Sequence, residues 1–162
     1  MASQYPISIT GLSPRDAVID ALHRSILAID SGDVALFQTC MFNSPETTFK
    51  IVGGRTVQGS KAIEEHMVNT ILPLSTLHSV TNIRVSFPNS NPEEAKEARL
   101  TANAIAYHYR PEDAFKPEHL SFTTGGMYDI EMLKDESDGL WKAKTWTLKL
   151  NWTEGDRAAI FG

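Results

Sequence analysis

The sequence has 162 residues, of which 41% are hydrophobic, and a formal net charge of -5 at pH 7. This length and hydrophobic content fit a single domain with one core, and they exclude an intrinsically disordered chain. The acidic balance and the dispersed Lys and Arg residues argue against nucleic acid as a partner.

The chain carries no recognisable targeting or membrane signal. The first residues lack the basic and apolar pattern of a signal peptide, and no stretch approaches the roughly 20 apolar residues of a membrane span. We therefore expect a cytoplasmic protein with no membrane partner. The single cysteine, Cys40, excludes an internal disulfide and a thiolate metal cage. Because the sequence has no His and carboxylate cluster and no glycine-rich phosphate loop, we expect no metal and no other cofactor.

Three helices are predicted in the first half of the chain. Ser13-Pro14 begins the first helix, which ends at the Asp-Ser-Gly-Asp break of residues 30–33. A second, short helix is predicted over residues 33–40, and a third over residues 59–71, where apolar residues recur at a spacing of four. Between these two helices, residues 47–57 predict a small hairpin around a Gly-Gly turn.

The second half of the chain reads almost entirely as strand. Turn-rich breaks, one of them at residues 88–92, separate four long candidates: 77–87, 97–109, 120–133 and 140–152. Consecutive strands with short connections predict an antiparallel meander, one face of which the three helices cover, and so an α+β fold. Gly125-Gly126 predicts a bulge or bend within the third long strand. We expect an N-terminal extension, residues 1–11, followed by a single domain, residues 12–162.

This order of elements resembles the SnoaL-like branch of the nuclear transport factor two superfamily. The resemblance rests on the break at 30–33, on residues 57–63 and on Leu77-His78. Residues 138–142 and 148–156 are similar to the closing strand of the family and of its relative, scytalone dehydratase. The resemblance implies a cone-shaped curved sheet wrapped by the helices, with one deep apolar pocket that serves dehydratases, isomerases, cyclases and members without catalysis.

The resemblance also implies a catalytic pair. In scytalone dehydratase an Asp at the end of the first helix and a His at the start of the first long strand reach into the pocket, and Asp30 and His78 occupy the matching places. A neutral imidazole can remove a proton next to a carbonyl or donate one to a leaving hydroxyl, and a neighbouring carboxylate fixes its tautomer. In the alternative interpretation Asp30 faces water and His78 packs against the third helix. The sequence has Ile29 and the hairpin residues 49–51 where that enzyme has two tyrosines, which makes scytalone itself a poor candidate substrate.

Other polar side chains can take the place of these phenols. Asn103, Tyr107 and Tyr109 share one face of the second long strand, opposite a face that carries alanines and His108. We expect the Asn103 face to line the pocket, because large side chains of mixed polarity can both fill and functionalise a cavity, although alternation alone allows either face. His108 would then lie on the surface. The other predicted substrate-binding residues are Tyr128, Phe49, Met67 and Trp146.

The sequence predicts a cofactor-independent lyase or isomerase of the dehydratase or cyclase type, which acts by general acid/base chemistry. Its ligand would be a hydrophobic, oxygenated small molecule such as a polyketide or terpenoid intermediate of secondary metabolism. The alternatives are a non-catalytic small-ligand-binding or association module of the same fold, and a protein whose cavity is closed by side chains. We also expect a homodimer joined through the exposed outer face of the long strands, with Ala102, Ala104, Ala106 and Met127 in the interface.

Overall fold

The computed structural model of the protein describes residues 2–88 and 91–162. Its first helix, α1 (Pro14–Ser31), forms where the local signals predict. The Ser13 side chain accepts a hydrogen bond from the backbone N–H of Asp16, and a proline occupies the first turn. Gly32 ends the helix with a φ of 64°, a left-handed conformation that costs glycine little.

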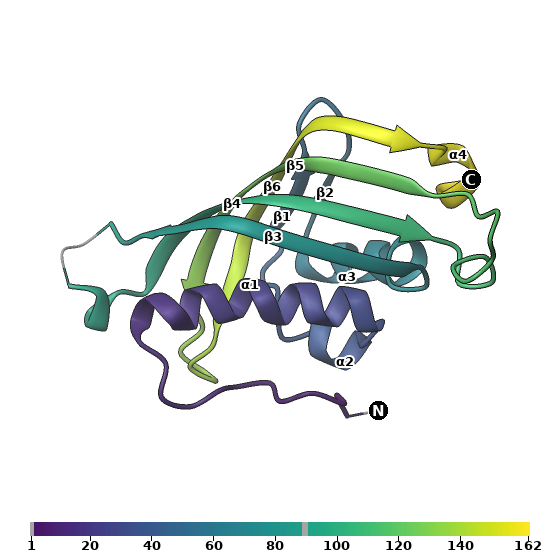
Figure 1. Ribbon diagram of the computed structural model, residues 1–162. Helices are drawn as coiled ribbons and strands as arrows, with labels where there is room; N and C mark the ends of the chain where they lie inside the picture. Colours follow the sequence, from purple (N-terminus) through teal and green to yellow (C-terminus); the bar gives the residue numbers. More distant parts are fainter. Residues whose placement is uncertain (1, 89–90) are drawn as a thin grey trace.

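The second helix, α2 (Val34–Phe37), begins directly after this turn. Asp33 caps it by accepting the backbone N–H of Leu36 at 2.9 Å. The other carboxylate oxygen of Asp33 accepts hydrogen bonds from Ser3 Oγ and from the backbone N–H of Gln4, both at 2.9 Å. These bonds hold the N-terminal segment beside the helices (Figure 1).

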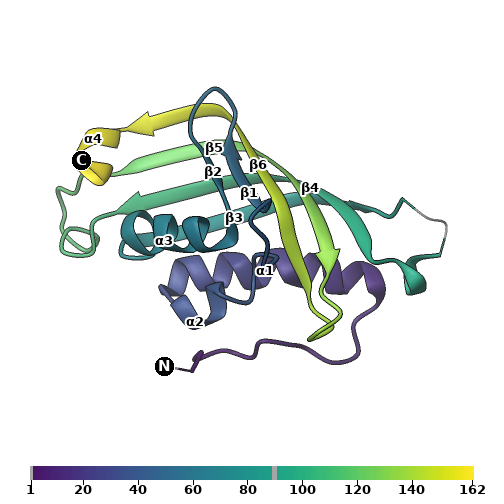
Figure 2. The same ribbon diagram turned by 180° about the vertical axis from the view of Figure 1, so that it is seen from behind.

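One six-stranded curved sheet forms the other layer (Figures 1 and 2). Its order is β2-β1-β6-β5-β4-β3, and the strands are β1 (Thr48–Ile51), β2 (Thr56–Gln58), β3 (Ser75–Ser86), β4 (Glu97–Tyr109), β5 (Phe122–Lys134) and β6 (Trp141–Gly155). Helix α3 (Ser60–Thr70) connects the hairpin to β3, a 3-10 turn η1 (Pro92–Glu94) precedes β4, and α4 (Arg157–Phe161) follows β6. The predicted α+β class, with a curved sheet wrapped by helices, is confirmed. The predicted turn at residues 88–92 includes residues 89 and 90, which lie outside the described residues.

The small hairpin joins the sheet in a way that the sequence did not predict. β3 to β6 form the expected antiparallel meander, but β1 pairs with β6 in parallel, with Phe49 opposite Trp146. The neighbouring Met41 forms a further parallel bridge to Ala143. The hairpin therefore extends the sheet on the side away from β3, where α3 packs against it.

Irregular pairing accompanies the curvature of the sheet at Gly125/Gly126 and Glu131/Met132 of β5 and at Thr81/Arg84 of β3. The register of β5 against β6 shifts between Gly125 and Gly126, which confirms the predicted bulge. A Cβ atom at Gly126 would lie 2.4 Å from the carbonyl oxygen of Lys149, so this close approach of two strands requires glycine. The register of β3 against β4 also shifts, and Asn82 adopts a φ of 54° there.

The face of β4 that meets the helices is the opposite of the predicted one. Ala102, Ala104 and Ala106 are buried, while Asn103 and Tyr107 lie on the exposed outer face. Helix α1 packs against β3, β4 and β6, and small alanine side chains allow it to approach β4 closely. The prediction that the Asn103 face lines the interior is therefore wrong, and so is the placement of the three alanines in an outer interface.

The core fills the space between the helices and the concave face of the sheet. Phe37, Ile63, Met67 and Trp146 are buried in it, and Phe49 packs against it from β1. These residues come from four different elements of the chain. The end of the cone at which β3 and β5 begin and β4 and β6 finish carries the candidate site.

Candidate functional site

Asp30 and His78 meet at the end of α1. The Nδ1–H of His78 donates to Asp30 Oδ1 at 2.6 Å, and Thr76 Oγ1 donates to the same oxygen at 2.8 Å. The backbone N–H of His78 donates to Asp30 Oδ2 at 2.8 Å. The side chains of His78 and Asp30 are only 7% and 16% exposed. These three donors explain how a carboxylate is held at the negative end of a helix dipole, where it is otherwise disfavoured.

The electrostatics of Asp30 determine the tautomer of His78. Burial raises the pKa of Asp30, but the hydrogen bonds and charge of His78, together with the Thr76 hydroxyl, outweigh burial and lower it below its ordinary value. An ionised carboxylate only accepts hydrogen bonds, so Nδ1 of His78 must carry the proton. In the neutral ring, Nε2 is then left with a free lone pair, which is the arrangement that a general base needs.

A second imidazole, His108, lies beside the first. Its ring centroid is 5.8 Å from that of His78, with an interplanar angle of 82°. His108 is 6% exposed, and its Nδ1–H donates to the backbone carbonyl of Phe122 at 2.9 Å. Burial and the charge of His78 lower its pKa, against raising effects of the Phe122 carbonyl and Asp30. The sequence assigned His108 to the surface, and this prediction is wrong. Alternation put His108 on the same face as the alanines of β4 but did not show which face is buried.

Tyr128 carries a phenol in the interior, near enough to Asp30 for the charge of that carboxylate to affect its pKa. Tyr128 is 6% exposed, and its ring packs edge-to-face on Trp146 at 5.0 Å. Burial, and then the charge of Asp30, raise the pKa of Tyr128, so the phenol stays protonated and is a hydrogen-bond donor. Met67 and Phe49, the remaining predicted wall residues, belong to the same core cluster.

Three other predicted residues are not brought to this place. Asn103 and Tyr107 lie on the exposed face of β4. Tyr109, at the end of β4, packs its ring against His119 in the following loop, at a centroid distance of 5.0 Å. None of the three has a described contact with Asp30 or His78, so their predicted role in substrate binding has no support in the structure.

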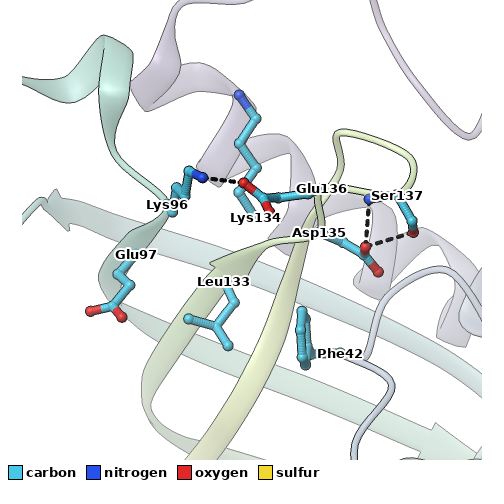
Figure 3. A pocket seen from close by; sticks show the side chains of 8 residues that line it. All are labelled: Phe42, Lys96, Glu97, Leu133, Lys134, Asp135, Glu136 and Ser137. Carbon is cyan, nitrogen blue, oxygen red and sulfur yellow. Dashed lines mark hydrogen bonds and ion pairs between the residues drawn. The ribbon is translucent and has the colours of Figure 1, made fainter.

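The larger of two described crevices lies at the other end of the sheet. It has a volume of about 380 Å³ and is lined by Phe42, Lys96, Glu97 and residues 133–137 (Figure 3). Two of its polar groups are paired within the lining: Lys96 pairs with Glu136, and Asp135 accepts hydrogen bonds from Ser137. The lining residues Glu97 and Leu133 are opposed near the ends of β4 and β5 farthest from His108 and Phe122. The second crevice, of about 260 Å³, lies beside the N-terminal segment and α1.

The described part of the chain, residues 2–88 and 91–162, holds no cluster of three or more His, Cys, Asp or Glu side chains suited to a metal ion. Among the same residues, no helix combines the length and apolar character needed to cross a membrane.

The chain is similar to known proteins over most of its length. A family model described as "SnoaL-like domain" matches residues 11–147. Terrestric acid biosynthesis cluster protein E of Penicillium crustosum is 38% identical over 162 residues, which cover 99% of this chain and 98% of that relative.

Solved structures share the fold at low sequence identity. The hexachlorocyclohexane dehydrochlorinase LinA-type3 of Novosphingobium barchaimii superposes with a TM-score of 0.67 at 16% identity, over 91% of this chain and 93% of its own. A provisionally assigned scytalone dehydratase of Novosphingobium aromaticivorans gives a TM-score of 0.71 at 16% identity, over 91% of each chain. At these identities the similarity establishes the fold alone.

Proposed function

Because the chain belongs to the SnoaL-like domain family, we propose that it is a cofactor-independent lyase or isomerase of the dehydratase or cyclase type. The observation that carries this proposal is the buried Asp30–His78 pair, in which one ring nitrogen is tied to a carboxylate and the other keeps its lone pair. The relative named for terrestric acid biosynthesis supports a substrate from secondary metabolism, a hydrophobic oxygenated molecule such as a polyketide intermediate.

The proposed chemistry moves one proton through His78. In an elimination, Nε2 takes a proton from a carbon next to a carbonyl, and the C–H electron pair becomes the new C=C bond as the C–O bond breaks. The departing hydroxyl then receives the proton from the imidazolium and leaves as water, which returns His78 to its neutral state. The ionised Asp30 stabilises the transient imidazolium. In an isomerisation the same proton returns to a different carbon.

Tyr128 is the proposed anchor for a substrate oxygen. Its protonated phenol can donate a hydrogen bond to a carbonyl on which negative charge develops as the proton leaves. His108, with its Nδ1–H bound to a carbonyl, offers a second neutral imidazole nitrogen near the reacting atoms. These two interior residues take the role that the sequence assigned to Asn103 and Tyr107.

The test follows proton abstraction without requiring the natural substrate. Candidate polyketide-like ketones are incubated with the protein in D₂O, and NMR measures the loss of the C–H signal next to the carbonyl. We expect exchange with the wild type and a rate at least about 10²-fold lower with His78→Gln. His23→Gln, which changes an exposed histidine, is the matched control. Equal exchange by the wild type and a folded His78→Gln protein would contradict the proposal.

A non-catalytic small-ligand-binding or association module of the same fold is the second candidate. Two observations favour it: the two described crevices lie away from Asp30, and aromatic side chains pack against His108. Binding of an apolar ketone without any proton exchange, in the wild type as in His78→Gln, would support this alternative.

We further propose that the protein is a homodimer joined through the outer face of its sheet. Large exposed apolar side chains lie on four adjacent strands there: Leu77, Ile105, Tyr107, Met127 and Trp152. The pairing places Leu77 opposite Tyr107, and both Ile105 and Trp152 opposite Gly125, so the group is continuous across the sheet. An exposed apolar patch of this kind is typical of a protein interface.

Sedimentation at micromolar concentration tests the dimer. We expect about twice the mass of the 17.9 kDa chain for the wild type, and a single chain for Tyr107→Lys, which places a charge in the patch. A wild-type mass close to that of one chain would refute the dimer. A cytoplasmic location stays a prediction of the sequence.

A further inference from the structure

The last element of the fold, α4, lies at the same end of the sheet as the Asp30–His78 pair. Figures 1 and 2 place it where β4 and β6 finish and β5 begins. Gly155, with a φ of 90°, joins β6 to the helix, and Asp156 caps it by accepting the backbone N–H of Ala159 at 3.0 Å. Residues 148–162, which include this helix, fall outside the part of the chain that the family model matches.

Two apolar side chains dock α4 onto the site. Ile160 is 5% exposed. The ring of Phe161 lies 5.5 Å from the His108 ring and 5.9 Å from the Phe122 ring, edge-to-face in both cases. Since His108 in turn lies against His78, a continuous line of ring contacts runs from α4 to the catalytic pair.

We propose that α4 is a hinged stopper, in which Phe161 seals the imidazole of His108 and must withdraw to admit a ligand. The seal accounts for a site in which His108 is buried and the side chains of His78 and Asp30 are only 7% and 16% exposed, although its chemistry requires access for a small molecule. Outside its own hydrogen bonds, the helix is held by Ile160, by the Phe161 ring contacts and by the bond from the Asp156 N–H to the Ser121 carbonyl. A five-residue helix with so few attachments belongs to the least stable part of a fold.

Gly155 fixes the end of the paired strand, and the hinge follows it. Gly155 itself is closely packed. Its left-handed φ is one that other residues rarely adopt, and a Cβ atom there would lie 2.1 Å from the carbonyl oxygen of Ser121. The strand therefore stays paired up to this point, while the residues that follow it turn back over His108 and Phe122. Rotation directly after residue 156 moves Phe161 off His108 and leaves the β5–β6 pairing in place.

The first test observes His108 itself, so it does not depend on turnover. The titratable groups near its ring are His78 and Asp30, and the Arg157 guanidinium lies over the Phe161 ring. Burial holds the pKa of His108 low, so Phe161→Ala should admit water and raise that pKa, as measured by NMR of labelled histidine. Phe161→Leu keeps an apolar side chain over the ring, so the pKa of His108 in this variant should lie between the values of the wild type and of Phe161→Ala. Phe115→Ala, which removes a ring that is 98% exposed, should leave the pKa unchanged.

The second test measures entry. The choice of an apolar ketone as ligand rests on the proposed function, and the probe is 2-adamantanone. If α4 covers the site most of the time, Phe161→Ala should raise the association rate constant about tenfold or more, because the open fraction limits binding. An unchanged rate and an unchanged His108 pKa, in a folded variant, would overturn the stopper even if the protein proves to be an enzyme.

Amide hydrogen exchange is measured in the wild-type protein, so the result does not depend on whether a variant folds. The amides of Ile160 and Phe161 should exchange far faster than that of Trp146 in the middle of β6. Equally slow exchange at both places would show that α4 does not open, and it would refute the inference. If no proton exchange of a ketone is found, but the α4 amides exchange fast and Phe161→Ala shifts the pKa of His108, the proposed function is wrong and the proposal for α4 is still supported.

Discussion

The two ends of the curved sheet both hold buried titratable groups, but the partner of the carboxylates differs: one end has a lysine that bridges two acids, and the other has an imidazole held by one acid. At the β5–β6 turn, Lys142 Nζ donates to Asp135 Oδ2 at 2.8 Å and to Asp138 Oδ2 at 2.6 Å, and Ser137 donates to the remaining oxygen of Asp135. At the other end, Asp30 is equally well satisfied, yet His78 keeps one ring nitrogen free.

This difference separates a structural ion cluster from a candidate reactive one. Asp135 has a pKa lowered to about 2, first by the hydrogen bond of Lys142, and it borders the larger crevice. Neither a shifted pKa nor a nearby crevice therefore identifies the site in this protein. What distinguishes the Asp30 end is an imidazole that a carboxylate orients through Nδ1, while no described residue bonds its Nε2.

The largest expected effect comes from Asp30→Asn. The amide retains the shape of the side chain but loses the negative charge that stabilises the imidazolium of His78. We expect proton exchange of the ketone substrate to slow by about 10²-fold or more. NMR in D₂O measures the rate, and circular dichroism checks the fold. The matched variant Asp135→Asn, at the other end of the sheet, should exchange at the wild-type rate; a similar loss in both variants would remove the distinction.

The opposite pattern is expected for Lys142→Met. The methionine keeps the apolar stem and leaves the carboxylates of Asp135 and Asp138 without their shared partner. We expect the free energy of unfolding to fall by about 2 kcal/mol, a value reduced for the partial exposure of both acids. Urea unfolding measures the loss, and the exchange rate of the ketone should stay unchanged. A stability equal to that of the wild type would show that the cluster is not structural.

The acid range of pH gives a smaller, directional prediction for Asp135. Its folded pKa of about 2 lies below an unfolded value of about 3.9, so its contribution is complete above about pH 4 and is lost as the pH falls through about 2. Asp135→Asn should be less stable than the wild type by about 1–2 kcal/mol at pH 7, discounted for solvent screening. This difference should shrink between pH 4 and pH 2 in urea titrations. A difference that is constant with pH would contradict the assignment.

The smallest effect is expected at the rim of the crevice. Lys96 and Glu136 form an ion pair whose side chains are 67% and 72% exposed. Because solvent screens such pairs, Lys96→Ala should change neither the urea midpoint nor the exchange of ketones. A measurable loss of activity would mean that the crevice, and not the Asp30 end, binds the substrate.

Local signals in the sequence placed Asp30 at the end of α1 and His78 near the start of β3, and the family resemblance predicted that the two meet. The break after Ser31 is a short-range feature, because Gly32 stops α1 whatever the rest of the chain does. His78 lies in the fourth position of β3, after a proline that cannot continue α3. Positions that depend on a helix-ending glycine or proline are predictable from the local sequence.

The inner face of β4 was not predictable in the same way. Alternation gives two faces with equal weight, and the choice depends on how closely α1 approaches the strand. The alanines face inward because their small side chains allow α1 to pack against β4. Residues 97–109 alone do not reveal this packing. The parallel pairing of β1 with β6 is similar: it joins Phe49 to Trp146, and no local pattern marks a contact over that separation.

The irregularity at Asn82 bears on how the protein avoids aggregation. β3 is an edge strand, and its outer row of backbone groups is a template to which a strand of another chain can add. The register shift and the left-handed Asn82 interrupt this row between Thr81 and Arg84. A strand of another chain therefore cannot pair continuously along the whole length of β3. Polymerisation through this edge is therefore disfavoured, whereas the proposed contact through the face of the sheet would give a closed, finite assembly.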